Sequence, residues 1–494
     1  MSCDPCRRYH YKCDGEQPCG RCTRVGRTCV RRSPHRFKHA RVADTTATWV
    51  DIPSELRFVD GDDDNPSNVL ITPGETASGV GAATFTPSPA CGSASEDGVY
   101  SAAYSAASVG GTPHPHEPGR LQPVSAYPVR DEQSARLIRH FVRVVSQFFD
   151  FCDEERHFAR AVPERARSDV TLANAMMACA ARHLSLTEGL DRTVADAYYQ
   201  KCLEAFIPAI ATRVDDETML AVTVILRFME ELEVPITERD SQDHLMGTQA
   251  IVRTYEQSHD TQTNPSGLLR AAKMAALRQD MYMSLTTQRP MMLTRRGMLP
   301  QTIEGMPRRS SDDEWANAAV GHCSDVLEYV FSAEPRSIDQ YHVLQAANEE
   351  WRLSKPASFA PYYVDHSPGA ALPNLSFVAD WHTMGYMYNL LASLLLKAHD
   401  PTLPRLGPSR RIAVASADEE IRKSTLTMAG IARSNPDTHS ALLVASMAIA
   451  MFGDRLTVQA EQQAVDHVLE QTQAKCGWPT GAARQMLQTA WQCV

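Results

Sequence analysis

The sequence predicts an all-α protein with three parts: a small cysteine-rich head, a disordered linker and a large all-helical domain. Three observations lead to this prediction. Six of the thirteen cysteines of the 494-residue chain lie between Cys3 and Cys29. From about residue 65 to 128 the chain is rich in Gly, Ser, Ala, Pro and Thr. After Asp131, apolar residues recur at the spacing of one helix face, and alternating strand patterns are scarce.

Composition and charge narrow the class of protein. The chain is 22% charged and 43% hydrophobic, which excludes a wholly disordered protein. Its net charge is -10, yet residues 1–41 hold eleven basic and three acidic residues, a local charge of +8. A basic head on an acidic body indicates a small module that binds a polyanion.

The chain shows no sign of secretion or membrane insertion. Met1 runs straight into cysteines and arginines, so no signal peptide is expected. No apolar run approaches the ~18 residues that a membrane span needs. We therefore expect an intracellular protein with reduced thiols, in which scattered cysteines are small buried apolar residues. These are Cys91, Cys152, Cys179, Cys202, Cys323, Cys476 and Cys493.

The clustered cysteines require another explanation. They form C-x2-C-x6-C twice, and the second unit repeats the first with a 16-residue offset. Few large apolar side chains lie between them, so no hydrophobic core can hold this segment together. Thiolates bind zinc tetrahedrally at about 2.3 Å, and that binding free energy serves as folding free energy. The six candidate ligands are Cys3, Cys6, Cys13, Cys19, Cys22 and Cys29.

The number of sulfurs bears on the number of metal ions. Six thiolates cannot make two separate four-sulfur sites, but two Zn²⁺ ions are both four-coordinate if two sulfurs bridge them. A duplicated unit suits this arrangement, with one shared ligand from each half. The alternatives are a three-disulfide knot, which a reducing compartment disfavours, and incidental thiols.

The stretch from Cys3 to Cys29 resembles the fungal binuclear zinc-cluster transcription factors, and it fits the spacing of that family at every cysteine. The resemblance implies that Cys3 and Cys19 are the bridging thiolates. It further implies that Cys6 and Cys13 complete one zinc site and that Cys22 and Cys29 complete the other.

The same resemblance implies that a short helix after Cys6 recognises a CGG-type DNA triplet. Arg and Lys side chains can donate to guanine O6 and N7 in the major groove, whereas phosphate contacts are independent of sequence. The candidate DNA-binding residues are Arg7, Arg8, His10 and Lys12 in the first half and Arg21, Arg24 and Arg27 in the second. Further basic residues up to Arg41 suit phosphate contacts, a nuclear import signal or a solvated charged surface.

One departure from the family concerns base recognition. Family members commonly read RRRKxKC, and this chain reads RRYHYKC, so Tyr9 and His10 replace two basic residues. A neutral imidazole can donate one hydrogen bond but lacks a fixed charge. We expect weaker or altered reading of the triplet. Alternatively, Tyr9 and His10 cover the cluster while Arg8 and Lys12 contact DNA.

The domain boundaries follow composition. We predict a DNA-binding domain with a basic extension at 1–41, a largely disordered linker at 42–130 and the all-helical domain at 131–494. Residues 36–64 resemble a segment that follows the cluster in one fungal subfamily, although their acidic and aromatic residues also suit an activation motif. Residues 33–60 show no sustained heptads, so either the helical domain dimerises or the protein binds DNA as a monomer.

The helical domain resembles the fungal-specific regulatory domain that accompanies such clusters, over a stretch running from SARLIRHF through CAARHLS. The resemblance implies that this part modulates activity and is not a catalyst. After a first apolar run at 137–148, helices are expected at Val170–Leu184, Thr193–Thr212, Glu217–Leu232, Ser241–Tyr255, Asp313–Phe331, Ser376–Lys397, Ile412–Ser434, His439–Phe452 and Val458–Thr472.

Nothing in the sequence indicates an enzyme. The chain has no H-E-x-x-H, G-x-S-x-G or G-x-x-x-x-G-K motif. We expect its acidic cluster to serve helix capping and surface solvation; the cluster comprises Asp150, Asp153, Glu154, Glu155 and His157. The methionines near 281–292 are expected to fill the core. A small-molecule pocket between helices is compatible with the sequence, which does not locate it.

The predicted function is that of a nuclear, zinc-dependent, sequence-specific regulator of RNA polymerase II genes. Its expected partners are double-stranded DNA with CGG-type sites, the transcription machinery and, through the helical domain, a second copy of the chain. The resemblance to the family favours an activator. It also favours a metabolic or secondary-metabolite gene cluster as the target. The competing hypothesis is a ligand-sensing interaction protein whose zinc cluster is structural; a helical enzyme with a zinc appendage is a third.

Overall fold

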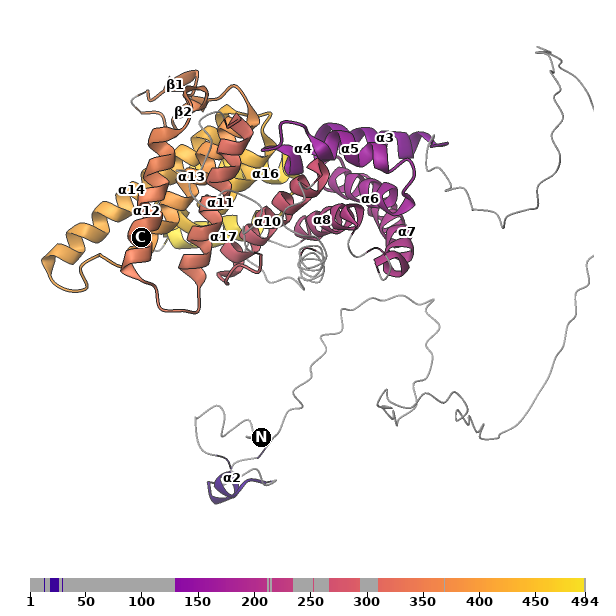
Figure 1. Cartoon of the computed structure of the whole chain (residues 1–494). Coiled ribbons are helices and arrows are strands. Elements are labelled where there is room, and N and C mark those ends of the chain that lie inside the picture. The colour runs from indigo at the N-terminus through magenta and orange to yellow at the C-terminus, as the bar shows by residue number, and fades with distance from the viewer. Residues whose placement is uncertain are drawn as a thin grey trace, which may run out of the picture. The chain divides into compact units, whose positions relative to one another are not determined.

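The computed structural model describes residues 13, 18–25, 29, 129–210, 213, 216–233, 252, 266–293, 310–367 and 369–492. The chain divides into two compact units, residues 1–111 and 112–494. In the first unit the described part centres on one short helix, α2 (Gly20–Arg24). The second unit is helical, which confirms the predicted all-α fold (Figure 1). The domain boundaries at 41 and 130 remain a prediction.

The second unit begins with a broken helix. Asp131 caps α3 (Glu132–His140) by accepting a hydrogen bond from the Ser134 backbone. A π-helical turn, η1 (Phe141–Val145), follows, and the Ser146 amide bonds the Phe141 carbonyl across it at 2.8 Å. α4 (Gln147–Asp150) completes the run. Of the apolar positions expected from the sequence, Leu137, Phe141, Val145 and Phe148 are buried and Val144 is half-buried. The π turn between them was not predicted.

Helices of ordinary length make up the rest of this unit. Their bounds are α5 (His157–Arg165), α6 (Val170–Thr187), α7 (Arg192–Ile210), α8 (Glu217–Glu231), α10 (Gly267–Thr287), α11 (Asp312–Phe331), α12 (Ile338–Ser354), α13 (Asp380–Ala398), α14 (Pro408–Ser434), α15 (His439–Phe452), α16 (Gln459–Cys476) and α17 (Gly481–Gln492). Two short 3-10 turns are η2 (Ala357–Phe359) and η3 (Gly453–Arg455).

The helices pack in two groups around α10, which contacts both (Figure 1). On one side α6 packs against α7 and α8; on the other α11 packs against α13, and α14, α15 and α16 pack in succession. The central helices are apolar on most faces, as helices enclosed by others must be. In α6, for example, every residue from Thr171 to Leu184 is buried.

The described part of the second unit contains one antiparallel strand pair, β1 (Tyr363–Asp365) and β2 (Asn374–Ser376), with Tyr363 opposite Ser376. This corrects one prediction, because the helix expected from Ser376 begins only at Asp380. The side chain of Asn435 accepts a hydrogen bond from the Phe377 amide at 2.9 Å and donates to the Leu375 carbonyl at 2.8 Å. These bonds keep the backbone extended at Leu375 and Phe377, so α13 begins only after them.

The other expected helices are found with ends shifted by a few residues, and His439–Phe452 is found without a shift. Helices α5, α10, α12 and α17 were not predicted. The helix expected at 241–255 lies outside the described residues except for Val252. Within the described ranges, no helix combines the length and the apolarity that crossing a membrane requires.

Two predictions about side chains are confirmed in the core. The scattered thiols Cys152, Cys179, Cys202, Cys323 and Cys476 are all buried and free; Cys91 and Cys493 lie outside the described residues. Among the methionines near 281–292, Met281 and Met283 are buried, and Met291 and Met292 pack against the core.

Candidate metal centre

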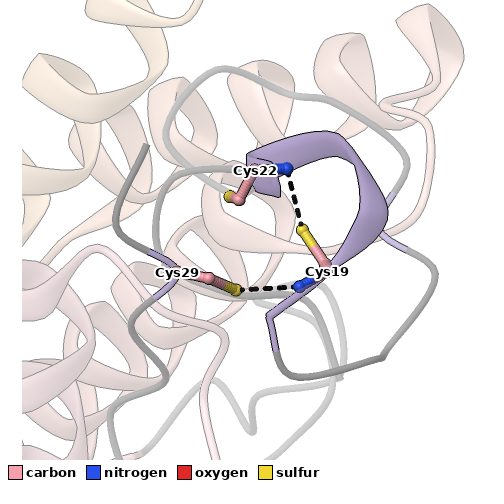
Figure 2. A group of neighbouring side chains, drawn as sticks. All are labelled: Cys19, Cys22 and Cys29. Carbon is pink, nitrogen blue, oxygen red and sulfur yellow. Dashed lines mark hydrogen bonds between the residues drawn. The ribbon is translucent and has the colours of Figure 1, made fainter. Parts of the chain in front are cut away.

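Three cysteine side chains converge in the first unit. The Sγ atoms of Cys19, Cys22 and Cys29 all lie within 4.8 Å of one another (Figure 2). Cys19 and Cys22 are 0% and 3% exposed, and the half-buried Cys29 and Cys13 pack against them. Sulfurs bound to one tetrahedral zinc are about 3.8 Å apart for zinc–sulfur bonds of about 2.3 Å. This spacing therefore suits ligands of one metal ion.

Helix α2 accounts for the placement of two of these sulfurs. It begins directly after Cys19, and Cys22 follows three positions later, so both residues lie on the same helix face. The amide and the hydroxyl of Thr23 donate to the Cys19 carbonyl at 3.0 and 3.1 Å, which closes the first helical turn. The C-x2-C spacing thus becomes a pair of adjacent ligands through one turn of helix.

Backbone amides support the sulfurs. The Cys19 amide donates to Cys29 Sγ at 3.3 Å, and the Cys22 amide donates to Cys19 Sγ at 3.4 Å (Figure 2). Hydrogen bonds of this kind favour the anionic sulfur that binds metal and orient it. The first bond also joins the two ends of the second C-x2-C-x6-C unit. Soft thiolate ligands in this arrangement suit zinc.

Only some of the predicted site residues fall within the described part of the chain. Cys13, Cys19, Cys22 and Cys29 do, and the structure brings the last three together. Arg24 is exposed at the end of α2, and Arg21 lies on the same helix. The other predicted ligands and DNA contacts lie outside the described residues: Cys3, Cys6, Arg7, Arg8, His10, Lys12 and Arg27.

The acidic cluster of the second unit serves as a helix cap. The Asp150 carboxylate accepts the amides of Phe158 at 2.9 Å and Ala159 at 2.8 Å, at the start of α5. Asp153 accepts the amide of His157 at 2.8 Å. The capping prediction is confirmed. Surface solvation is wrong for Asp150, which is buried, and burial raises the pKa of its carboxyl to about 7.

Comparison with known protein families gives two matches. Residues 1–38 match the fungal Zn(2)-Cys(6) binuclear cluster domain, and residues 136–492 match the fungal specific transcription factor domain. The second match alone covers more than half of the chain. No curated protein and no solved structure shows a significant match.

Proposed function

Because the chain belongs to the fungal specific transcription factor family and carries a binuclear cluster domain that binds two zinc ions, we propose that it acts in the nucleus as an activator at CGG-type DNA elements. That it is a zinc-dependent, DNA-binding transcription regulator follows from the family. The proposal adds the site sequence, the direction of regulation and the location. The observation that supports it most directly is the convergence of three cysteine sulfurs beside a basic helix.

For the metal ions we propose the six cysteines from Cys3 to Cys29 as ligands, with Cys3 and Cys19 bridging. The converging sulfurs of Cys19, Cys22 and Cys29 support the second half of this assignment. Zinc supplies the folding free energy that the short apolar-poor segment lacks. The cysteines bind the ions, and the folded cluster positions α2 with its basic residues.

For DNA we propose a division of labour between the two halves of the head. In the first half, the segment that follows Cys6 contacts bases, as the resemblance to the family implies, through Arg7, Arg8, His10 and Lys12. In the second half, exposed Arg24 and its neighbours Arg21 and Arg27 contact phosphates. The +8 charge of residues 1–41 provides the attraction to a polyanion.

Fluorescence anisotropy with the full, zinc-loaded chain tests this assignment on a CGG-containing duplex and a scrambled duplex of equal length. Lys12→Ala should weaken CGG binding roughly tenfold or more and leave the scrambled duplex little changed, because a base contact carries about 1–3 kcal/mol of discrimination. Arg24→Ala should weaken both duplexes alike and lower the salt slope by about one. Arg411→Ala, an exposed arginine of the second unit, serves as the control.

The competing function is a regulator whose cluster is structural and does not read DNA; His10, in place of the usual lysine, is the observation that favours it. Equal affinity for the two duplexes, unaffected by Lys12→Ala, would decide for that function and against ours.

We further propose that two copies associate through the helical unit, because residues 33–60 carry no heptads. Sedimentation of the full chain measures this association directly.

We also propose that the protein contacts the transcription machinery and controls a metabolic or secondary-metabolite gene cluster. Genome-wide mapping of bound sites, together with transcript levels after deletion, tests the targets and the direction of regulation.

A further inference from the structure

A cavity lies where the two helix groups of the second unit meet. Its volume is about 50 Å³, and its wall comes from α4, α8, α10, α13, α15 and the segment after α16. Aromatic rings dominate the wall. Phe228 packs edge-on against Phe149 at 5.1 Å and against Trp478 at 5.6 Å between ring centroids. Such a wall offers apolar contact to a ligand.

Polar side chains interrupt this apolar wall, and three of them bear on its occupant. Arg278, Gln279 and Ser440 line the cavity and are 8%, 6% and 3% exposed. Each has a buried polar atom without a hydrogen-bond partner among the described residues: Nε of Arg278, Oε1 of Gln279 and Oγ of Ser440. Buried polar groups are hydrogen-bonded with few exceptions, and an unsatisfied one is destabilising. Three such atoms around one cavity indicate an occupant that satisfies them.

The cavity wall also contains a buried cation, Arg278. The Arg278 guanidinium lies 4.3 Å from the centre of the Phe151 ring and donates to the Phe149 carbonyl, but it forms no ion pair with a described residue. Glu231 lines the cavity as well, and Arg227 pairs with its carboxylate at 3.3 Å. The carboxyl of Asp150 interacts electrostatically with Arg278, but it already accepts the hydrogen bonds that cap α5. A buried cation without an ion-pair partner is costly, and a small anion would offset that cost.

The size of the cavity restricts the occupant. One water needs about 10–15 Å³, so this cavity holds about four or five non-hydrogen atoms. We propose that it binds a short 2-hydroxycarboxylate of glycolate size. The carboxylate accepts hydrogen bonds from Arg278 Nε and Ser440 Oγ, the hydroxyl donates to Gln279 Oε1, and the carbon atoms lie against the aromatic wall. Each unpartnered atom then has a partner of the right polarity.

The position of the cavity suits a regulatory ligand. Ser440 belongs to α15, in one helix group, and Arg278 to the central helix α10, so one small anion would join that group to the helix that contacts both groups. The role of this ligand as an effector rests on the proposed regulatory function. Binding of the ligand to the cavity does not depend on that function.

Isothermal titration of the full, zinc-loaded chain with glycolate tests binding, with acetate as the matched acid that lacks the hydroxyl and sodium chloride as the salt control. We expect glycolate to bind more tightly than acetate and to raise the melting temperature. Ser440→Ala should weaken glycolate binding about tenfold, because it removes a hydrogen bond to a charged group. Gln279→Met should abolish the preference for glycolate over acetate.

Two further variants separate the cavity from general effects. Ala275→Val fills the cavity with two methyl groups, keeps every polar atom and should abolish binding. Ser324→Ala changes another buried serine, on α11 and outside the cavity, and should bind glycolate as the unaltered chain does. If Ala275→Val does not fold, the glycolate affinities of Ser440→Ala and Ser324→Ala still test the proposal.

Absence of heat and of a melting shift with glycolate would mean that ordered waters fill the cavity, and would overturn the inference. The inference would also be overturned if Ser440→Ala and Ser324→Ala weakened glycolate binding equally. Preference for CGG duplexes is measured without any acid. Failure of glycolate to bind therefore leaves the DNA proposal intact, and loss of the CGG preference leaves the cavity proposal intact.

Discussion

The indole Nε1 of Trp478 donates a hydrogen bond to the hydroxyl oxygen of Tyr282 at 2.9 Å, between residues 196 positions apart. Both side chains are buried, and their rings meet nearly at right angles, with centroids 5.2 Å apart. This contact ties the turn between α16 and α17 to α10. The C-terminal helices are therefore anchored to the centre of the second unit.

Tyr282→Phe should lower the free energy of unfolding by about 1–3 kcal/mol, because it leaves a buried indole N–H without its acceptor. Urea denaturation followed by circular dichroism measures the change. Tyr363→Phe is the matched control, since Tyr363 is exposed on β1 and should be neutral. A similar loss in both variants would contradict the role of the Trp478 contact.

Gly430→Ala should destabilise the second unit by about 1–3 kcal/mol through overpacking. A Cβ at this position of α14 would lie 2.1 Å from the carbonyl oxygen of Pro373, so backbone would have to move. Gly481→Ala is the control, because its nearest neighbouring atom would be 4.0 Å away and alanine favours the helix. Thermal unfolding of the two variants compares them, and a stable Gly430→Ala protein would contradict the close approach.

Acid should weaken the second unit through His183. Burial, and then the charges of His140 and His439, lower the pKa of His183 to about 3, and burial also lowers the pKa of the other two. The unfolded chain then binds more protons than the folded one below pH of about 6.5, so this stability is present above that pH and is lost as the pH falls. Between pH 6.5 and 5, His183 alone should account for about 2 kcal/mol.

Denaturant titrations of the unaltered chain and of His183→Gln across this pH range measure the effect as the difference between the two profiles, because the raised pKa of Asp150 opposes it equally in both proteins. His467→Gln alters an exposed histidine and should leave the profile as it is. Profiles of the same slope in the unaltered chain and in His183→Gln would contradict the role of His183.

Zinc content should follow the converging cysteines. Elemental analysis of the purified chain should give two zinc ions, and Cys22→Ser should lose at least one of them together with CGG binding, because zinc binding and folding are coupled in the head. Cys323→Ala changes a buried thiol of α11 and should retain both ions. Fewer than two ions in the unaltered chain would contradict the binuclear cluster.

Local patterns explain which elements could be predicted. The helix His439–Phe452 was predicted to the residue because its apolar run has clear ends. Helix α12 (Ile338–Ser354) was missed because it is largely polar and only four of its residues are buried. The late start of α13 depends on Asn435, which is distant in sequence, and no local pattern reports such a bond.

The amino-acid order by itself predicted zinc binding, because the second C-x2-C-x6-C unit keeps Cys19, Cys22 and Cys29 close together along the chain. It also determined the helical class, since an apolar stripe is a local property. Only the tertiary structure decided that Asp150 is a buried cap and that Arg278, Gln279 and Ser440 surround one cavity. Those facts depend on which buried faces come together, and packing across the whole unit settles that.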